Sequence, residues 1–337
     1  MSRTKVASTM KEVAKRAGVS TATVSRAFSH PERLSASARH RVEEAVISCG
    51  YSVQQPAYAA ESRIILVTVT NLRNLIEAEV IQGIKETATE HNYLLFIHYD
   101  DPQNSEETSL QYLAFTRKIC GVIQIGNNSY STWLSKHGMP FLPQIIIGHS
   151  SYSPHSVTID IDHFTAAFTA VSNLCQLGYS RIAYLAGQKE NANSYYHEQG
   201  YKQALQRWRI SNEKHYIIYG ENTFQHGQNA ANKLLSLPSP PNAIYCQHDI
   251  IAIGAIYQIK QSGLNTPQHL SVIGFGNLEL GQFHSPALTS VNYPANLIGK
   301  QAVITLIEWL KRPNIKPKPH LFETEIIQRD TTYKRQY

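Results

Sequence analysis

The 337-residue sequence lacks the long apolar runs that mark a membrane protein. A membrane-spanning helix needs about 18 or more consecutive apolar residues, and no stretch of this chain approaches that length. The first 20 residues mix charged and polar side chains, whereas a signal peptide places an apolar run behind a basic end. The sequence therefore predicts neither a membrane span nor a secreted protein, and we expect a cytoplasmic protein.

Cysteine is scarce, and the cysteines are far apart in the chain. No two of them have the close spacing of a metal site or a redox pair, and no histidine lies near them at ligand spacing. We expect reduced thiols that pack as small apolar side chains, with a redox or metal role as the alternative. The four residues are Cys49, Cys120, Cys175 and Cys246.

Motifs of common enzyme classes are also missing. The chain has no G-x-S-x-G, no H-E-x-x-H and no glycine loop of the kind that cradles phosphate. The run Asp160-Ile161-Asp162-His163 could suggest a metal site, but strand alternation puts Ile161 on the opposite side, and the end of a strand is the plainer interpretation. We therefore expect no catalytic residues, no metal and no cofactor.

Positive charge is concentrated at the beginning of the chain. Residues 1–56 carry nine Lys or Arg against four Glu, so they hold +5 of the total net charge of +6. A basic head on a nearly neutral body is typical of a protein whose head alone contacts phosphate groups. The 42% apolar composition is enough for such a head and a large body with its own core.

Three short helices are predicted in the head. Thr9 and Glu12 form a capping box before the first helix, which Gly18 ends. Ser20 can cap a second helix over 21–28, and Ser35 can cap a third over about 36–48 with Gly50 as its C-cap. Two helices joined through a glycine turn, with a third as brace, make a helix-turn-helix domain.

The body alternates short β-branched runs with amphipathic segments, a pattern typical of parallel sheets covered by helices on both faces. About ten strands over 270 residues are too many for one sheet, so two lobes are expected. The predicted strands are 64–69, 93–98, 121–125, 144–148, 157–161, 181–186, 215–219, 243–246, 270–275 and 288–293.

The head carries a long ordered motif. It reads "MKEVAKRAGVSTATVSRAF" over 10–28 and "RLSASARHRVEEAVISCGY" over 33–51, and the body adds "TAAF" at 165–168, "QGY" at 199–201 and "LSVIGF" at 270–275. This chain resembles the lactose/galactose repressor (LacI/GalR) family over nearly its whole length. The resemblance implies a DNA-binding transcription regulator that acts by default as a repressor, here of nucleoside or sugar catabolic or transport genes.

The resemblance also implies the domain boundaries. An N-terminal all-α helix-turn-helix domain would span 8–56 and a linker 57–62. An α/β periplasmic-binding-protein-like body of two parallel-sheet lobes would span 63–332, with a small-molecule effector between the lobes. Lobe 1 would comprise about 63–162 plus 294–319, and lobe 2 about 163–290 plus 321–332.

The second helix is the predicted recognition helix. Thr21, Ala22 and Arg26 lie on the face that a major-groove helix presents to base edges, where Arg26 can donate two hydrogen bonds to a guanine. Polar residues around that face are expected to contact phosphates and to set the register without choosing sequence. These phosphate-contact candidates are Thr9, Lys15, Arg16, Ser20, Thr23 and Ser25.

The effector site departs from the family pattern. Asp162 and Asp249 match acidic positions, but His197 stands where the family commonly has a ligand-gripping Arg, His248 where it often has an amide or hydroxyl, and Gly276 where it commonly has an Asp. A hydrogen bond to a charged group contributes roughly 1.5–3 kcal/mol, so losing two could lower affinity on the order of a thousandfold. The site for a nucleoside-like or sugar effector is therefore predicted to be altered or lost.

Two interpretations of that departure stay open. Histidines and nearby tyrosines could bind a different small molecule, or the body could serve mainly for dimerisation and protein contact. The run Asn74-Leu75-Ile76-Glu77 also replaces the family's usual Asn/Asp-Pro-Phe-Phe stacking wall. The tyrosines in question are Tyr195, Tyr196 and Tyr201.

Assembly and partners follow from the same features. One recognition helix spans too few base pairs for genomic specificity, so a homodimer on a palindromic DNA operator is expected. The C-terminal run 329–337 lacks the apolar heptads of a tetramer-forming coiled coil.

The linker lacks the Leu that kinks the minor groove in many relatives, and the resemblance implies a DNA-bound partner, the cyclic-AMP receptor protein. A periplasmic solute-binding protein is the alternative, but the basic head and the absent signal peptide disfavour it.

Overall fold

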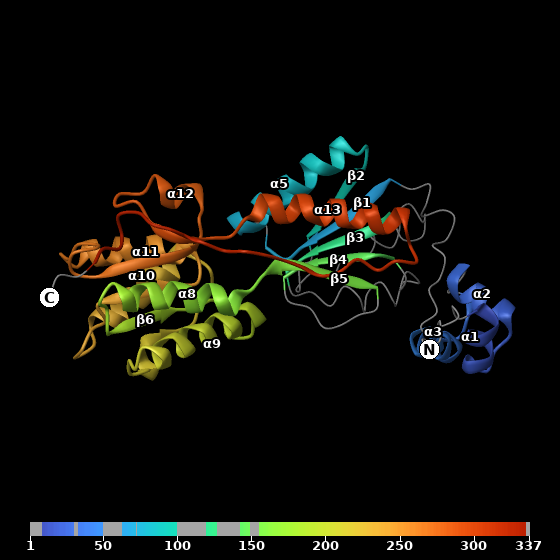
Figure 1. The fold of residues 1–337 in the computed structure, drawn as a ribbon, viewed down its shortest axis with the longest axis horizontal. Coiled ribbons are helices and arrows are strands. Elements are labelled where there is room, and N and C mark those ends of the chain that lie inside the picture. The colour runs from blue at the N-terminus through green and yellow to red at the C-terminus, as the bar shows by residue number, and fades with distance from the viewer. Residues whose placement is uncertain are drawn as a thin grey trace, which may run out of the picture. The chain divides into compact units, whose positions relative to one another are not determined.

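The fold is known from a computed structural model, which describes residues 9–29, 33–49, 63–71, 73–99, 119–126, 142–148 and 155–334. Helices and strands are labelled as in Figure 1. The chain divides into two compact units, and each is considered by itself. Unit 1 comprises Met1–Leu72, Val80–Ile159 and Ile298–His320, and unit 2 comprises Arg73–Glu79, Asp160–Leu297 and Leu321–Tyr337.

The head consists of three helices, each with the predicted start signal. They are α1 (Met10–Ala17), α2 (Thr21–Ser29) and α3 (Ala36–Cys49). Thr9 and Glu12 form the reciprocal capping box, and the backbone N–H groups of Thr23 and Ala38 donate to the hydroxyls of Ser20 (3.0 Å) and Ser35 (3.3 Å). Gly18 ends α1 in the left-handed conformation, with φ of +63°, which glycine adopts without steric cost. The predicted C-cap Gly50 and the linker 57–62 lie outside the described residues.

The core of the head is built from small side chains that meet where the helices cross. Such a core lets the helices approach closely, and it leaves the polar residues between these positions on the outside. Val13, Val24 and Val42 are completely buried at its centre. The remaining members of the cluster are Ala14, Ala17, Ala27, Ala45 and Val46.

Unit 1 also contains a six-stranded sheet in the order β11-β5-β4-β3-β1-β2. The pairs from β2 to β5 are parallel, and β1, β3 and β4 are almost entirely buried, as expected for strands covered on both faces. Helices α5 and α13 lie beside each other over this sheet (Figure 1). The elements are β1 (Ile64–Val69), α5 (Leu75–Glu90), β2 (Leu94–Tyr99), β3 (Ile119–Ile125), β4 (Gln144–Ile147), β5 (Ser156–Ile161), α13 (Ala295–Lys311) and β11 (His320–Phe322).

Unit 2 contains a second six-stranded sheet in the order β12-β10-β9-β8-β6-β7, parallel except for β12. Its strands are β6 (Ile182–Leu185), β7 (Ile217–Ile218), β8 (Ala243–Cys246), β9 (Ser271–Gly276), β10 (Thr289–Asn292) and β12 (Ile326–Ile327). Its helices are α8 (His163–Gln176), α9 (Ala192–Arg207), the 3₁₀ turn η2 (Lys214–Tyr216), α10 (Phe224–Leu235), α11 (Asp249–Gln261) and α12 (Glu279–Gln282).

The alternation of side chains along β6 and β8 divides the core of unit 2 between two helix layers. Leu185 and Cys246 belong to the apolar cluster shared with α10 and α11. Their neighbours Tyr184 and Tyr245 stack on each other at 5.4 Å, and Tyr184 also stacks on Tyr201 of α9 at 5.4 Å. Helices α8 and α9 therefore cover one face of the sheet, and α10 and α11 cover the other.

This architecture confirms the predicted fold class, an all-α helix-turn-helix domain followed by an α/β body with two parallel-sheet lobes. Each of the ten predicted strands overlaps an observed one. Among the described residues, the four cysteines form no disulfide, and burial raises the pKa of Cys120 and of Cys175 to about 12. Within the described ranges, no helix combines the length and the apolar character needed to cross a membrane.

Candidate DNA-binding surface and effector site

The outward face of α2 carries the predicted base-contacting residues. Thr21, Ala22 and Arg26 are all exposed, whereas Val24 is fully buried and Ala27 is nearly so. The buried pair fixes the helix on the core of the head, so the exposed face has a defined direction. The structure thus places a guanidinium, a hydroxyl and a methyl group on one solvent-facing surface.

The predicted phosphate-contacting residues surround that face on two helices. Lys15 and Arg16 are exposed in the last turn of α1, and Thr9 is exposed where α1 begins. The hydroxyls of Ser20 and Thr23 lie 2.9 Å apart at the start of α2. Their side chains thus already stabilise the helix start. The sixth candidate, Ser25, is exposed within α2.

Asp162 has a local structural partner. It is the N-cap of α8, and its carboxylate accepts hydrogen bonds from the backbone N–H (3.1 Å) and the hydroxyl (2.6 Å) of Thr165. Asp162 is exposed, so among the five effector candidates it alone presents a charged group at the surface. The same carboxylate would have to serve both the cap and a ligand.

His197 lies inside unit 2, in a continuous chain of side-chain hydrogen bonds. It is 1% exposed. Its Nδ1 lies 2.5 Å from the hydroxyl of Tyr245, and its Nε2 lies 3.0 Å from Nδ1 of His163. The other nitrogen of His163 lies 3.2 Å from Asp160, whose second oxygen accepts from the hydroxyl of Tyr293 at 3.0 Å. We call these five residues the buried polar chain.

With both imidazoles neutral, one proton arrangement satisfies every member of the buried polar chain. The carboxylate of Asp160 can only accept, so His163 donates to it from Nε2 and accepts at Nδ1. His197 must then donate from Nε2 and accept the hydroxyl proton of Tyr245 at Nδ1. Burial holds the pKa of His197 well below its usual range, which agrees with a neutral imidazole at this position.

His248 and Asp249 are buried at the start of α11. His248 is the N-cap, with Nδ1 accepting from the N–H of Ile250 and Nε2 lying 3.2 Å from the side-chain oxygen of Asn74. Asp249 accepts from the N–H of Leu278 (2.7 Å) and the hydroxyl of Ser290 (2.6 Å). Burial lowers the pKa of His248 to about 4 and raises that of Asp249 to about 6.

Gly276 ends β9 with φ of +124°, a conformation that side chains of L-residues rarely adopt. A Cβ there would lie 3.0 Å from Cδ1 of Ile76. The backbone at this position thus suits glycine and would be strained by the aspartate that the family pattern leads one to expect.

The carboxyl ends of β6 and β8 mark the point where the strand order of this sheet reverses, the usual ligand-binding position in open α/β sheets. Gln247 fills this position in the structure. Its oxygen accepts from the hydroxyl of Tyr184 (2.6 Å) and the N–H of Gly187 (2.7 Å), and its amide nitrogen donates to Ser194 (3.1 Å). The side chain is 7% exposed, so its polar atoms are used within the protein.

Three of these polar residues, Tyr245, Gln247 and Tyr293, were not predicted from the sequence. Asn74 and His163 entered only as members of a run at the stacking-wall position and of a possible metal motif. A partial signal existed in the Asp160–His163 spacing, which the structure turns into a 3.2 Å contact. Within the described residues, no group of three or more His, Cys, Asp or Glu side chains forms a metal-binding arrangement.

Comparison with known proteins gives two family matches. The model for bacterial regulatory proteins of the lacI family matches residues 9–54, and the model for a periplasmic binding protein-like domain matches residues 171–332. The first range covers the three-helix head, and the second covers most of unit 2 together with α13 of unit 1.

Individual proteins match over almost the full chain. The sequence is 37% identical over 329 residues to the HTH-type transcriptional repressor CytR of Escherichia coli (strain K12), covering 97% of this chain and 96% of that protein. It is 30% identical over 326 residues to catabolite control protein A of Priestia megaterium, covering 94% and 97%. A crystal structure of a regulatory protein of the LacI family from Chloroflexus aggregans aligns with a TM-score of 0.72 and 25% identity, covering 80% of this chain and 98% of that one.

Proposed function

The chain belongs to the LacI family of bacterial regulatory proteins, and on that premise we propose that it is a sequence-specific transcription repressor that binds a DNA operator through its head. The observation that carries this function is the exposed face of α2, where Thr21, Ala22 and Arg26 stand over the buried Val24. The function is binding and not catalysis. The similarity to CytR points to nucleoside or sugar catabolic and transport genes as targets.

The repressor acts as a homodimer. The nine-residue α2 can present only two turns of side chains to a major groove, and two copies related by a twofold axis double the number of base pairs that are read. We expect light scattering of the purified protein to give twice the mass of one chain. A mass of one chain at operator-binding concentrations would contradict the dimer. A mass of four chains would show a tetramer and would also contradict the proposal.

The recognition face is tested by substituting Arg26. We expect Arg26→Ala to weaken operator binding by about 1–3 kcal/mol and to relax the preference at one base pair per half-site. Lys15→Ala is the matched control because a phosphate contact weakens operator and random DNA alike. Binding to randomised DNA pools, followed by sequencing, measures both effects. An unchanged operator-to-random ratio in Arg26→Ala would contradict the assignment.

The second part of the proposal concerns control by small molecules. His197, His248, Asp249 and Gln247 are buried and bonded within unit 2. We infer that these groups stabilise the fold and that nucleosides and simple sugars do not control the protein through them. Thermal unfolding with a panel of nucleosides, pentoses and hexoses should show no shift at millimolar concentration. A ligand whose Kd lies about 1,000 times below its concentration would stabilise by about 4 kcal/mol and overturn this inference.

A DNA-bound partner would then supplement operator occupancy. The linker lacks the Leu wedge, so each head keeps more orientational freedom and tolerates changed half-site spacing. We propose the cyclic-AMP receptor protein as that partner, bound at an adjacent site. Operators with half-sites moved apart by single base pairs should keep most of their affinity, and the partner should raise occupancy. A sharp loss of affinity at every changed spacing would contradict this part.

A further inference from the structure

The connection between α13 and β11 is the most basic stretch of the body. Its sequence over 311–320 is "KRPNIKPKPH", with four Lys or Arg and no Asp or Glu. Because residues 57–337 carry a net charge of +1 in total, the rest of the body carries −3. The stretch is therefore positive in a body whose remainder is net negative. Three prolines limit the backbone conformations that it can adopt.

The cations of this stretch project into solvent. Lys311, Arg312 and Lys318 are exposed. Within the part of the chain that the structure describes, no carboxylate lies within salt-bridge distance of these three side chains. Such side chains keep their full charge available to a partner and are screened only by salt.

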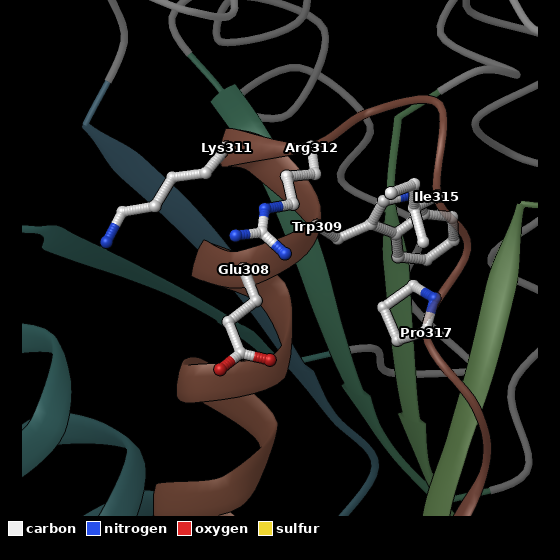
Figure 2. A pocket seen from close by; sticks show the side chains of 6 residues that line it. All are labelled: Glu308, Trp309, Lys311, Arg312, Ile315 and Pro317. Atoms are coloured by element: carbon white, nitrogen blue, oxygen red, sulfur yellow. The ribbon is translucent and has the colours of Figure 1, made fainter.

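A hollow beside the cations gives the surface a defined shape. Lys311 and Arg312 line it together with Trp309, Ile315 and Pro317, and its volume is about 400 Å³ (Figure 2). Trp309 is 5% exposed and holds the end of α13 in place. Glu308 is the one acidic side chain among the lining residues.

Contacts within unit 1 place this surface at the edge of the sheet where the chain enters from the linker. Leu306 of α13 packs on Gly121 near the start of β3, and Gly121 is paired with Ile65 near the start of β1. The stretch leads into β11, which pairs with β5. Burial, with the charge of Lys316 adding to it, lowers the pKa of His155, the residue before β5, to about 4. The stretch thus runs along the amino-terminal ends of the strands.

We propose that this surface, Lys311, Arg312 and Lys318, is a second DNA contact that binds the phosphate backbone beside the operator. The proposal rests on operator binding by the head. Only twelve residues separate α3 and its following glycine from Arg63, and a chain of that length spans about 40 Å at most. The DNA held by the head therefore lies within reach of the edge that carries the cations. Phosphate contact needs only positive charge and no base-reading geometry.

The test is the triple variant Lys311→Gln, Arg312→Gln, Lys318→Gln in the full-length protein. Its matched control, Arg207→Gln, Lys233→Gln, Lys260→Gln, removes three exposed cations from helices of unit 2. Binding is measured on the bare operator and on the operator with flanks of about 12 base pairs, which span roughly 40 Å at 3.4 Å per pair. Thermal unfolding confirms that both variants are folded.

We expect the wild type and the control to bind the flanked operator more tightly than the bare one, and the triple variant to lose that gain. Each phosphate contact makes binding about 3.5-fold weaker between 50 and 200 mM salt, so one contact per protomer corresponds to roughly 12-fold for the dimer. The affinity of the triple variant should fall less than that of the wild type over this salt range, by at least about that factor, while its operator-to-random ratio stays unchanged.

Two results would overturn the inference. One is a triple variant with the flank gain and salt dependence of the wild type. The other is a triple variant that binds DNA normally but loses joint occupancy with the cyclic-AMP receptor protein, which would assign the surface to a protein partner. A wild-type protein that binds operator and random DNA equally would instead contradict the function proposed for the head.

Discussion

The head and unit 2 use polar side chains in opposite ways. In the head, small apolar residues fill the core and Thr21, Arg26 and their polar neighbours face outward. In unit 2, His197, Gln247 and Asp249 are buried and hydrogen-bonded to other parts of the same unit. Polar residues therefore have different roles in the two regions, and the residue type alone does not predict the role. The polar side chains on the outer face of α2 are exposed to solvent, whereas these three in unit 2 are buried and stabilise the fold.

The largest expected effect comes from breaking the buried polar chain at Asp160. Asp160→Ala leaves the hydroxyl of Tyr293 and the Nε2–H of His163 without an acceptor. We expect the free energy of unfolding to fall by about 2–5 kcal/mol, while the head keeps its operator-to-random ratio. Glu221→Ala, at an exposed position, is the control and should change stability by less than about 0.5 kcal/mol. Equal losses of unfolding free energy in Asp160→Ala and Glu221→Ala would contradict a stabilising role for the buried polar chain.

The next effect is a pH dependence caused by His248. Burial lowers its pKa to about 4 in the folded state, against 6.5 for an unperturbed histidine, so the unfolded chain takes up the proton first as the pH falls. The stability present above pH 6.5 is therefore lost between pH 6.5 and 4, by about 3 kcal/mol. His248→Asn keeps a capping side chain but does not titrate. Its free energy of unfolding should therefore fall by about 3 kcal/mol less than that of the wild type as the pH is lowered.

Asp249 titrates in the opposite direction over the same pH range. Its folded-state pKa of about 6 lies above its usual 3.8, so its contribution falls as the pH rises through 6. Asp249 is present in both the wild type and His248→Asn, so its contribution cancels when their pH dependences are compared. Denaturant unfolding at about pH 7 and about pH 4.5, above this range and near its lower end, measures most of the difference, with exposed His91→Asn as control. Parallel pH curves for wild type and His248→Asn would show that the imidazole of His248 does not contribute.

The smallest expected effect is at the start of α3. Ser35→Ala removes the hydroxyl that accepts from Ala38 and should lower the stability of the head by about 1 kcal/mol. Arg41→Gln, at an exposed position farther along α3, is the control and should have little effect. The melting transition of the head, followed separately from that of the body, gives the measurement. A change in the melting temperature of the body alone would contradict the expectation that the head unfolds as a separate unit with its own core.

The predictable parts of this molecule are those whose causes are local in sequence. Each helix start in the head depends on a side chain and a backbone group three residues apart, as in the Thr9–Glu12 box. The sequence predicts strand β1 with its observed bounds, Ile64–Val69, because its apolar run ends abruptly. It does not predict β11 and β12, because these strands have three and two residues and leave most of their side chains partly exposed.

The surroundings of the effector candidates could not be predicted in the same way. The partners of His197 are 34 and 48 residues away in the sequence, and Asp160 and Tyr293 are 133 residues apart. Departures from the family pattern therefore mark positions in the sequence but do not predict which side chains surround them. Burial that depends on such distant segments is a property of the tertiary structure, and it produces no repeating pattern of apolar residues from which it could be predicted.

The buried polar chain also has a direction. With both imidazoles neutral, every bond from Tyr245 through His197 and His163 to Asp160 is donated in the same direction. Turning either imidazole to its other tautomer would set two donors or two acceptors against each other unless its neighbour changed as well. The buried polar chain should therefore behave as one cooperative element that links Tyr245 to Asp160.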